Sequence, residues 1–155
     1  MRSKKTNITE DENDNFTKKL LESVKKGEEM IIKKDYHSAI EILDRVIENN
    51  IPLENAFFYR GFAKRELNQF LESIIDFNLE LILNAEHIAA LINCIYSLNS
   101  LRRFHESYAL ANKLVEIYPD GETYEIRGNV KKKLGDYKGA QEDFKKANEY
   151  PRSCF

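Results

Sequence analysis

The sequence has few of the residues that interrupt helices and little net charge. Only 6 glycines and 3 prolines occur in 155 residues, tryptophan is absent, and 24 basic side chains nearly balance 26 acidic ones. Scarce glycine and proline argue against a loop-rich β architecture. A net charge of −2 gives no sign of a nucleic-acid or membrane-surface protein. We therefore expect long helices around one core of ordinary size.

We expect no secretory leader, no membrane span and no cysteine motif in this sequence. Residues 10–14, four of them acidic, stand where a signal peptide needs an apolar stretch. The longest uncharged run, from His87 to Leu101, is too short and too polar to span a membrane. Cys94 and Cys154 have neither metal-ligand nor redox-motif spacing. We expect a cytoplasmic protein with reduced thiols.

A repeat of about 34 residues runs through most of the chain. Tyr36, Phe70 and Phe104 are 34 residues apart, and Tyr137 follows 33 residues later. A small residue stands three positions after each of these aromatics: Ala39, Ser73, Ser107 and Ala140. In three units a glycine occupies a shared position upstream of the aromatic: Gly27, Gly61 and Gly128.

The repeat divides the chain into four units, each with two segments whose apolar residues recur at helical spacing. Each unit is therefore predicted to be a pair of antiparallel helices. The predicted units span residues 20–53, 54–87, 88–120 and 121–154. We expect a single domain over 15–150, a flexible acidic tail over 1–14 and a short C-terminal tail over 151–155.

Two of the units carry motifs that resemble a known repeat. The pattern in the fourth unit is Arg127-Gly128, Leu134-Gly135-Asp136-Tyr137, Ala140, Asp143-Phe144 and Ala147, and that in the second is Arg60-Gly61, Leu67, Phe70, Ser73 and Asp76-Phe77. Both resemble the tetratricopeptide repeat. The resemblance implies an all-α fold, a right-handed α-solenoid of four antiparallel helix-turn-helix repeats.

Departures from the pattern give further expectations. In the third unit Ile95 replaces the glycine and Ala111 replaces the large apolar residue, so we expect volume lost in one helix to be restored from the other. Glu80 replaces a small or apolar residue, and we expect it at a helix edge or beside a basic neighbour. Asp35 and Asp136 are predicted to cap helices. The helix after Phe70 is apolar over a wide arc, which predicts that neighbours cover it.

The resemblance implies that the first helix of each unit lines a concave groove for a peptide segment of another protein. The family's inward-facing positions correspond here to Val24, Glu28 and Ile31; Phe58, Phe62 and Arg65; Ile92, Tyr96 and Asn99; and Glu125, Asn129 and Lys132. An equally weighted alternative is that Phe58, Phe62 and Tyr96 are core residues. The residues that clamp chaperone tails in some members of the family are absent.

No catalytic, metal or cofactor motif is found, and His37 and His105 share one repeat position. We therefore expect a non-enzymatic adaptor or chaperone-like scaffold without cofactor, nucleic acid or membrane. The alternative is a structural subunit or homodimer that buries its apolar middle or a terminal helix. Lys131-Lys132-Lys133 could bind anions, but helix-end lysines are usually solvated. Ser153-Cys154-Phe155 resembles a strand-addition ligand, a pattern that is common by chance.

Overall fold

The computed structural model describes residues 10–49 and 51–150. In these two ranges the chain forms eight α-helices and no strand. The helices are α1 (Glu10–Ile32), α2 (Tyr36–Ile47), α3 (Ala56–Glu66), α4 (Phe70–Leu83), α5 (Ile88–Ser100), α6 (Phe104–Ile117), α7 (Gly121–Lys133) and α8 (Tyr137–Glu149).

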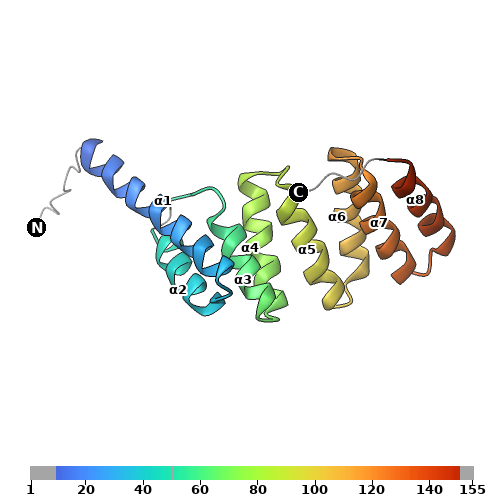
Figure 1. Ribbon diagram of the computed structural model, residues 1–155, viewed down its shortest axis with the longest axis horizontal. Coiled ribbons are helices and arrows are strands. Elements are labelled where there is room, and N and C mark those ends of the chain that lie inside the picture. Colours follow the sequence, from blue (N-terminus) through green and yellow to red (C-terminus); the bar gives the residue numbers. More distant parts are fainter. Residues whose placement is uncertain (1–9, 50, 151–155) are drawn as a thin grey trace, which may run out of the picture.

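The helices pack as four consecutive pairs, α1 with α2, α3 with α4, α5 with α6 and α7 with α8. Each second helix also contacts the first helix of the next pair. Figure 1 shows the pairs side by side along the long axis of the molecule, from α1 at one end to α8 at the other. The predicted all-α architecture of four antiparallel helix pairs is confirmed.

The N-terminal boundary differs from the prediction. Helix α1 begins at Glu10, so residues 10–14 of the expected flexible tail are helical. Further along α1, Leu20 and Val24 lie one turn apart and are both buried. In Figure 1 the N-terminal end of α1 projects beyond the stack. The rest of that tail and the expected tail over 151–155 lie outside the described residues.

Aspartates cap three of the helices. Asp35 and Asp136 each accept a hydrogen bond from the backbone N–H three residues later, at 3.2 and 2.9 Å, so both predicted caps are confirmed. Before α7, the Asp120 carboxylate accepts the Thr123 N–H at 2.8 Å, and the Thr123 hydroxyl accepts the Asp120 N–H at 3.1 Å. This reciprocal pair fixes where α7 begins.

In α1, α3 and α7 a glycine lies against a large side chain of the paired second helix. A Cβ atom placed on these glycines would come within 2.7–3.0 Å of that side chain. The pairs are Gly27 with Leu43, Gly61 with Phe77, and Gly128 with Phe144. Because a side chain on the glycine would collide, the glycine sets how closely the two helices approach.

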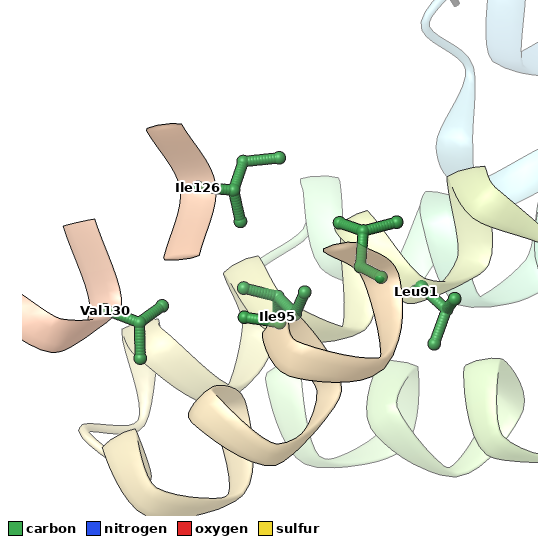
Figure 2. Packing of buried hydrophobic residues seen from close by; sticks show 6 residues of the cluster. Leu91, Ile95, Ile126 and Val130 are labelled. Carbon is green, nitrogen blue, oxygen red and sulfur yellow. The ribbon is translucent and has the colours of Figure 1, made fainter. Parts of the chain in front are cut away.

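The third pair reaches the same packing with the sizes exchanged. Ile95 of α5 and Ala111 of α6 are both fully buried in one cluster, which also contains Leu91, Ile126 and Val130. Figure 2 shows the labelled members of this cluster on α5 and α7. The predicted exchange of volume between the two helices is confirmed.

A buried aspartate holds the first and second helices together in two of the pairs. Asp76 of α4 is 1% exposed. It accepts hydrogen bonds from Arg60 at 3.0 Å (Nε) and 2.6 Å (Nη2), and from Lys64 Nζ at 2.8 Å. The fourth pair repeats this arrangement with Asp143, Arg127 and Lys131. Charge-assisted hydrogen bonds offset the cost of burying these carboxylates.

Glu80 has a role that the sequence did not predict. It is fully buried, so the expectation of a helix edge is wrong. Its carboxylate accepts the backbone N–H groups of Asn55 and Phe58, both at 3.2 Å, where α3 begins. Asn55 makes no side-chain cap of its own. Glu80 therefore caps α3 from the neighbouring helix α4. The basic neighbour of the other expectation is His87, whose Nε2 lies 3.8 Å from Glu80 Oε1.

Replacing Arg127 with Met should lower the free energy of unfolding by about 2–4 kcal/mol, because it removes the bidentate hydrogen-bond partner of the buried Asp143 carboxylate. Denaturant unfolding measures this change. Arg103→Met is the matched control, since the ion pair of Arg103 with Glu106 lies on the surface and contributes little. Equal losses in the two variants would show that burial of Asp143 does not govern the cost.

The same carboxylate predicts a stability loss in acid. Burial alone would raise the pKa of Asp143, but hydrogen bonds and charge from Arg127 and Lys131 hold it below its ordinary value of 3.8. Protonation therefore occurs at lower pH in the folded chain than in the unfolded chain. The stabilisation is complete above pH 3.8 and is lost as pH falls through the folded pKa. Between pH 7 and about pH 2.5, Asp143→Asn should lose less unfolding free energy than the parent.

Candidate functional site

The first helices form a common layer, in which α1 contacts α3 and α3 contacts α5. Close contact between first helices draws this side of the stack together, which favours the concavity that the resemblance implies. We call it the first-helix face. The predicted groove residues lie on α1, α3, α5 and α7, but they differ in exposure.

The part of the face on α1 is mostly occupied by contacts within the chain. Val24 is 6% exposed and belongs to a core cluster with Leu20 and Val46, so its assignment to the groove is wrong. Glu28 and Ile31 are half-buried. Burial, a hydrogen bond with Glu28 and the negative charge of Glu28 together raise the pKa of Tyr59. Glu28 therefore already has a partner on α3.

Phe58 packs as a core residue. Its ring centroid lies 4.8 Å from that of His87 and 6.2 Å from that of Phe77, and the side chain is half-buried against the cluster around Phe77. The core alternative therefore holds for Phe58.

Phe62 and Arg65 lie one turn apart on α3 and are both half-buried. The Arg65 guanidinium carbon lies 4.9 Å from the centroid of the Phe62 ring, a cation–π contact, and the guanidinium also pairs with Glu66. The Nε atom of Arg65 is buried without a hydrogen-bond partner. This side chain is positioned by stacking while one of its donors is unused.

On α5, Tyr96 is the exposed member of the predicted set. Its side chain is 45% exposed, whereas Ile92 packs against the buried cluster between α5 and α7. Burial of its inner part, and the charges of Glu122 and Glu125, raise the pKa of Tyr96. Asn99, one turn further along, has a buried Oδ1 atom without a hydrogen-bond partner.

On α7 the predicted residues are polar. Glu125 is half-buried, and Asn129 and Lys132 are exposed. Of the other two lysines in the run, Lys131 binds Asp143 at 2.9 Å, and Lys133 lies 5.6 Å from the centroid of an aromatic ring. Only Lys131 of the run is thus engaged by a buried carboxylate, whereas Lys132 and Lys133 are exposed.

His87 has a structural role that the sequence did not reveal. Its Nδ1 atom accepts the Ala90 N–H at 3.3 Å and caps α5, while Nε2 lies 2.8 Å from Asn55 Oδ1. Cys94 is a buried free thiol, and burial raises its pKa to about 12, which keeps it unreactive. In the residues that the structure describes, no cluster of His, Cys, Asp or Glu could hold a metal ion.

A surface hollow of about 250 Å³ lies on the side of the stack away from the first-helix face. Its walls come from α4, α5 and α6 and include Cys94 and Leu110. These residues occupy the repeat positions that hold Arg60 and Asp76 in the second pair. The buried ion pair is thus replaced by two uncharged side chains, and a hollow is present beside them.

Comparison with known families identifies the repeat. The tetratricopeptide-repeat model matches residues 121–154, the span predicted for the fourth unit. The other three helix pairs stack on this unit with the same order of elements. Residues 121–154 are therefore a tetratricopeptide repeat.

Solved structures with the same fold include several of MamA. One MamA crystal structure is 20% identical, covers 84% of this chain and 77% of its own, and superposes with a TM-score of 0.80. MamA from Desulfovibrio magneticus RS-1 is 16% identical, with 82% of this chain and 72% of its own covered and a TM-score of 0.76. Such low identity establishes the tetratricopeptide-repeat fold alone. The comparison with curated proteins finds no match.

Within residues 10–49 and 51–150, no helix combines the length and the apolar character that crossing a bilayer requires.

Alanine substitutions of two aromatic residues distinguish a packed position from an exposed one by their cost in stability. Phe58→Ala should lower the free energy of unfolding by about 2–4 kcal/mol, because it empties a packed site. Tyr96→Ala should cost less than about 1 kcal/mol, since nearly half of the side chain is already in water. Urea denaturation followed by circular dichroism tests both, and comparable losses would place Tyr96 in the core.

Proposed function

We propose that the protein is a non-enzymatic adaptor that binds an extended peptide segment of another protein across the middle of the first-helix face. The central groove consists of Phe62 and Arg65 on α3 and Tyr96 and Asn99 on α5. It is smaller than the set predicted from the sequence, because Val24 is a core residue and the half-buried Phe58 and Ile92 pack against core clusters.

Unused hydrogen-bonding groups in the central groove carry this proposal. Arg65 Nε is a donor and Asn99 Oδ1 is an acceptor, and both are buried without a partner. The two residues occupy the same position in consecutive repeats. An extended peptide offers carbonyl acceptors and N–H donors along one edge, so a small turn of each side chain would satisfy both groups. Unpaired buried polar groups are costly, which favours such a partner.

The apolar part of the groove sets the expected strength of binding. Covering the exposed part of Tyr96 and the half-buried ring of Phe62 would contribute roughly 2–4 kcal/mol. Two hydrogen bonds add about 1 kcal/mol each, and ordering of the peptide offsets part of the sum. The central groove alone therefore gives a dissociation constant no tighter than about 40 µM, and contacts on its flanks are needed for tighter binding.

The remaining predicted residues lie on either side of the central groove. Glu28 and Ile31 lie towards the N-terminal end, and Glu125, Asn129 and Lys132 lie towards the C-terminal end. In this proposal they contact the flanks of the peptide and set its direction. The partner is another protein rather than a nucleic acid or a membrane. A free Cys94 fits the reducing conditions of the cytoplasm, the proposed location.

Selection of random peptides displayed on phage against the purified chain tests the proposal. Selected peptides should bind with micromolar affinity in fluorescence anisotropy, and Tyr96→Ala and Asn99→Leu should each weaken binding about tenfold or more. Tyr137→Ala is the matched control, because Tyr137 is 66% exposed and lies on α8, outside the first helices. Peptides that bind the Tyr96 and Asn99 variants as tightly as the parent would place recognition elsewhere.

Salt dependence separates this function from anion binding by the α7 lysines. Binding in the central groove should change little between low and moderate salt, whereas binding of a polyanion should weaken steeply. A steep salt dependence that Lys132→Ala reduces would favour the anionic ligand.

A further inference from the structure

The hollow between α4, α5 and α6 lies where two other units of the stack have a buried ion-pair cluster. In the second unit the Arg60 guanidinium joins two second helices, because it binds Asp76 of α4 and donates from Nη1 to Asp44 of α2 at 2.7 Å. In the fourth unit Arg127 joins α8 and α6 in the same way. A planar guanidinium therefore fills this space in both units.

The third unit lacks the charged members of this cluster. The positions that hold arginine, lysine and aspartate in the second and fourth units are occupied by Cys94, Leu98 and Leu110. Asn78 of α4 occupies the position of Asp44, which accepts the arginine Nη1 group in the second unit. All four third-unit residues line the hollow of about 250 Å³. The hollow thus corresponds to the place of the missing guanidinium, and Asn78 has no arginine to bind.

The hollow has apolar walls and a polar rim without net charge. Ile74, Cys94 and Leu98 line it and are buried. At the rim, Arg103 donates from Nε and Nη2 to the Glu106 carboxylate at 2.7 and 2.6 Å. Because these two charges neutralise each other, the hollow favours neither a cation nor an anion. Apolar walls also hold water poorly, since a bound water needs several polar partners.

We propose that this hollow is a binding site for a small uncharged phenol, whose ring takes the place of the missing guanidinium. The hydroxyl group donates to Asn78 Oδ1, as the arginine Nη1 group donates to Asp44 in the second unit. The ring is planar like the guanidinium and packs against Leu98 and Leu110. An aliphatic cavity of about 150 Å³ is enough to bind benzene, so a hollow of about 250 Å³ has room for one ring.

The ion pair at the rim favours a free molecule over the tyrosine side chain of a partner protein. The side chains of Arg103 and Glu106 are 40% and 56% exposed. A protein docked over the hollow would remove water from both charges, which is costly, whereas a single ring leaves them in water. The hollow lies away from the first-helix face, so its ligand does not compete with a peptide in the central groove.

Titration of the full chain with phenol, followed by NMR of its isoleucine and leucine methyl groups, tests this site. The shifts should saturate, centre on Ile74, Leu98 and Leu110, and give a dissociation constant of about 1–10 mM, as expected for a ligand of one ring. Asn78→Ala should weaken binding about fivefold, because it removes one hydrogen bond. Asn129→Ala is the matched control, since Asn129 is exposed on α7 and should leave binding unchanged. Shifts that never saturate, or equal affinities in the two variants, would overturn the proposal.

Two filling variants separate binding in the hollow from binding elsewhere. The triple variant Cys94→Arg/Leu98→Lys/Leu110→Asp restores the ion-pair cluster of the second and fourth units, and Cys94→Met fills the hollow without adding charge. With helical circular dichroism retained, each variant should lose the saturable shift of the Ile74 methyl groups. A filled variant that binds phenol as tightly as the parent would place the ligand elsewhere and contradict the proposal.

Related compounds test the chemistry of the ligand. Toluene has no hydroxyl group, so it should bind the parent and Asn78→Ala equally well. Benzoate should give no saturable shift, because its carboxylate would lose water against apolar walls. The proposal fails if Asn78→Ala weakens toluene as much as phenol, or if benzoate binds as tightly as phenol. Tighter binding of N-acetyltyrosinamide than of phenol would instead identify a protein side chain as the occupant and overturn the assignment of a free molecule.

Discussion

The close approach of the two helices within each pair is the constraint on which the rest of the structure depends. Where the first helix carries glycine, a large side chain of the second helix fills the space that a Cβ atom would need. The third pair satisfies the same constraint with Ile95 and Ala111. Because interiors are close-packed, this contact fixes the pair geometry, and the stack follows by repetition of that geometry.

Buried polar groups fix the relative orientation of the packed helices. In the second and fourth pairs an aspartate on one helix binds arginine and lysine on the other, which fixes how the helices are rotated against each other. Glu80 supplies the cap that the start of α3 lacks. The third pair has Cys94 and Leu110 in place of the ion pair, and a hollow is found there. Local exchanges thus alter single units without altering the stack.

The side chains that differ between repeats are of different kinds on the two sides of the stack. On the first-helix face, the central groove combines exposed aromatic surface at Tyr96 with unpaired polar atoms on Arg65 and Asn99. On the opposite side, helix α4 exposes three large apolar side chains, Leu71, Ile75 and Ile82. The prediction that neighbours cover the wide apolar arc of this helix is therefore wrong for these residues.

The sequence by itself determined the repeat interval, the helix pairs, the caps at Asp35 and Asp136 and the exchange of volume in the third unit. These features depend on spacing along the chain, which the sequence displays directly. Only the tertiary structure decided that Val24 is a core residue, that Glu80 caps α3 and that the apolar side chains of Ile75 and Ile82 stay exposed. A repeat position defines which way a side chain points from its own helix. Its exposure depends on all the helices and loops packed around it, and those neighbours differ from unit to unit.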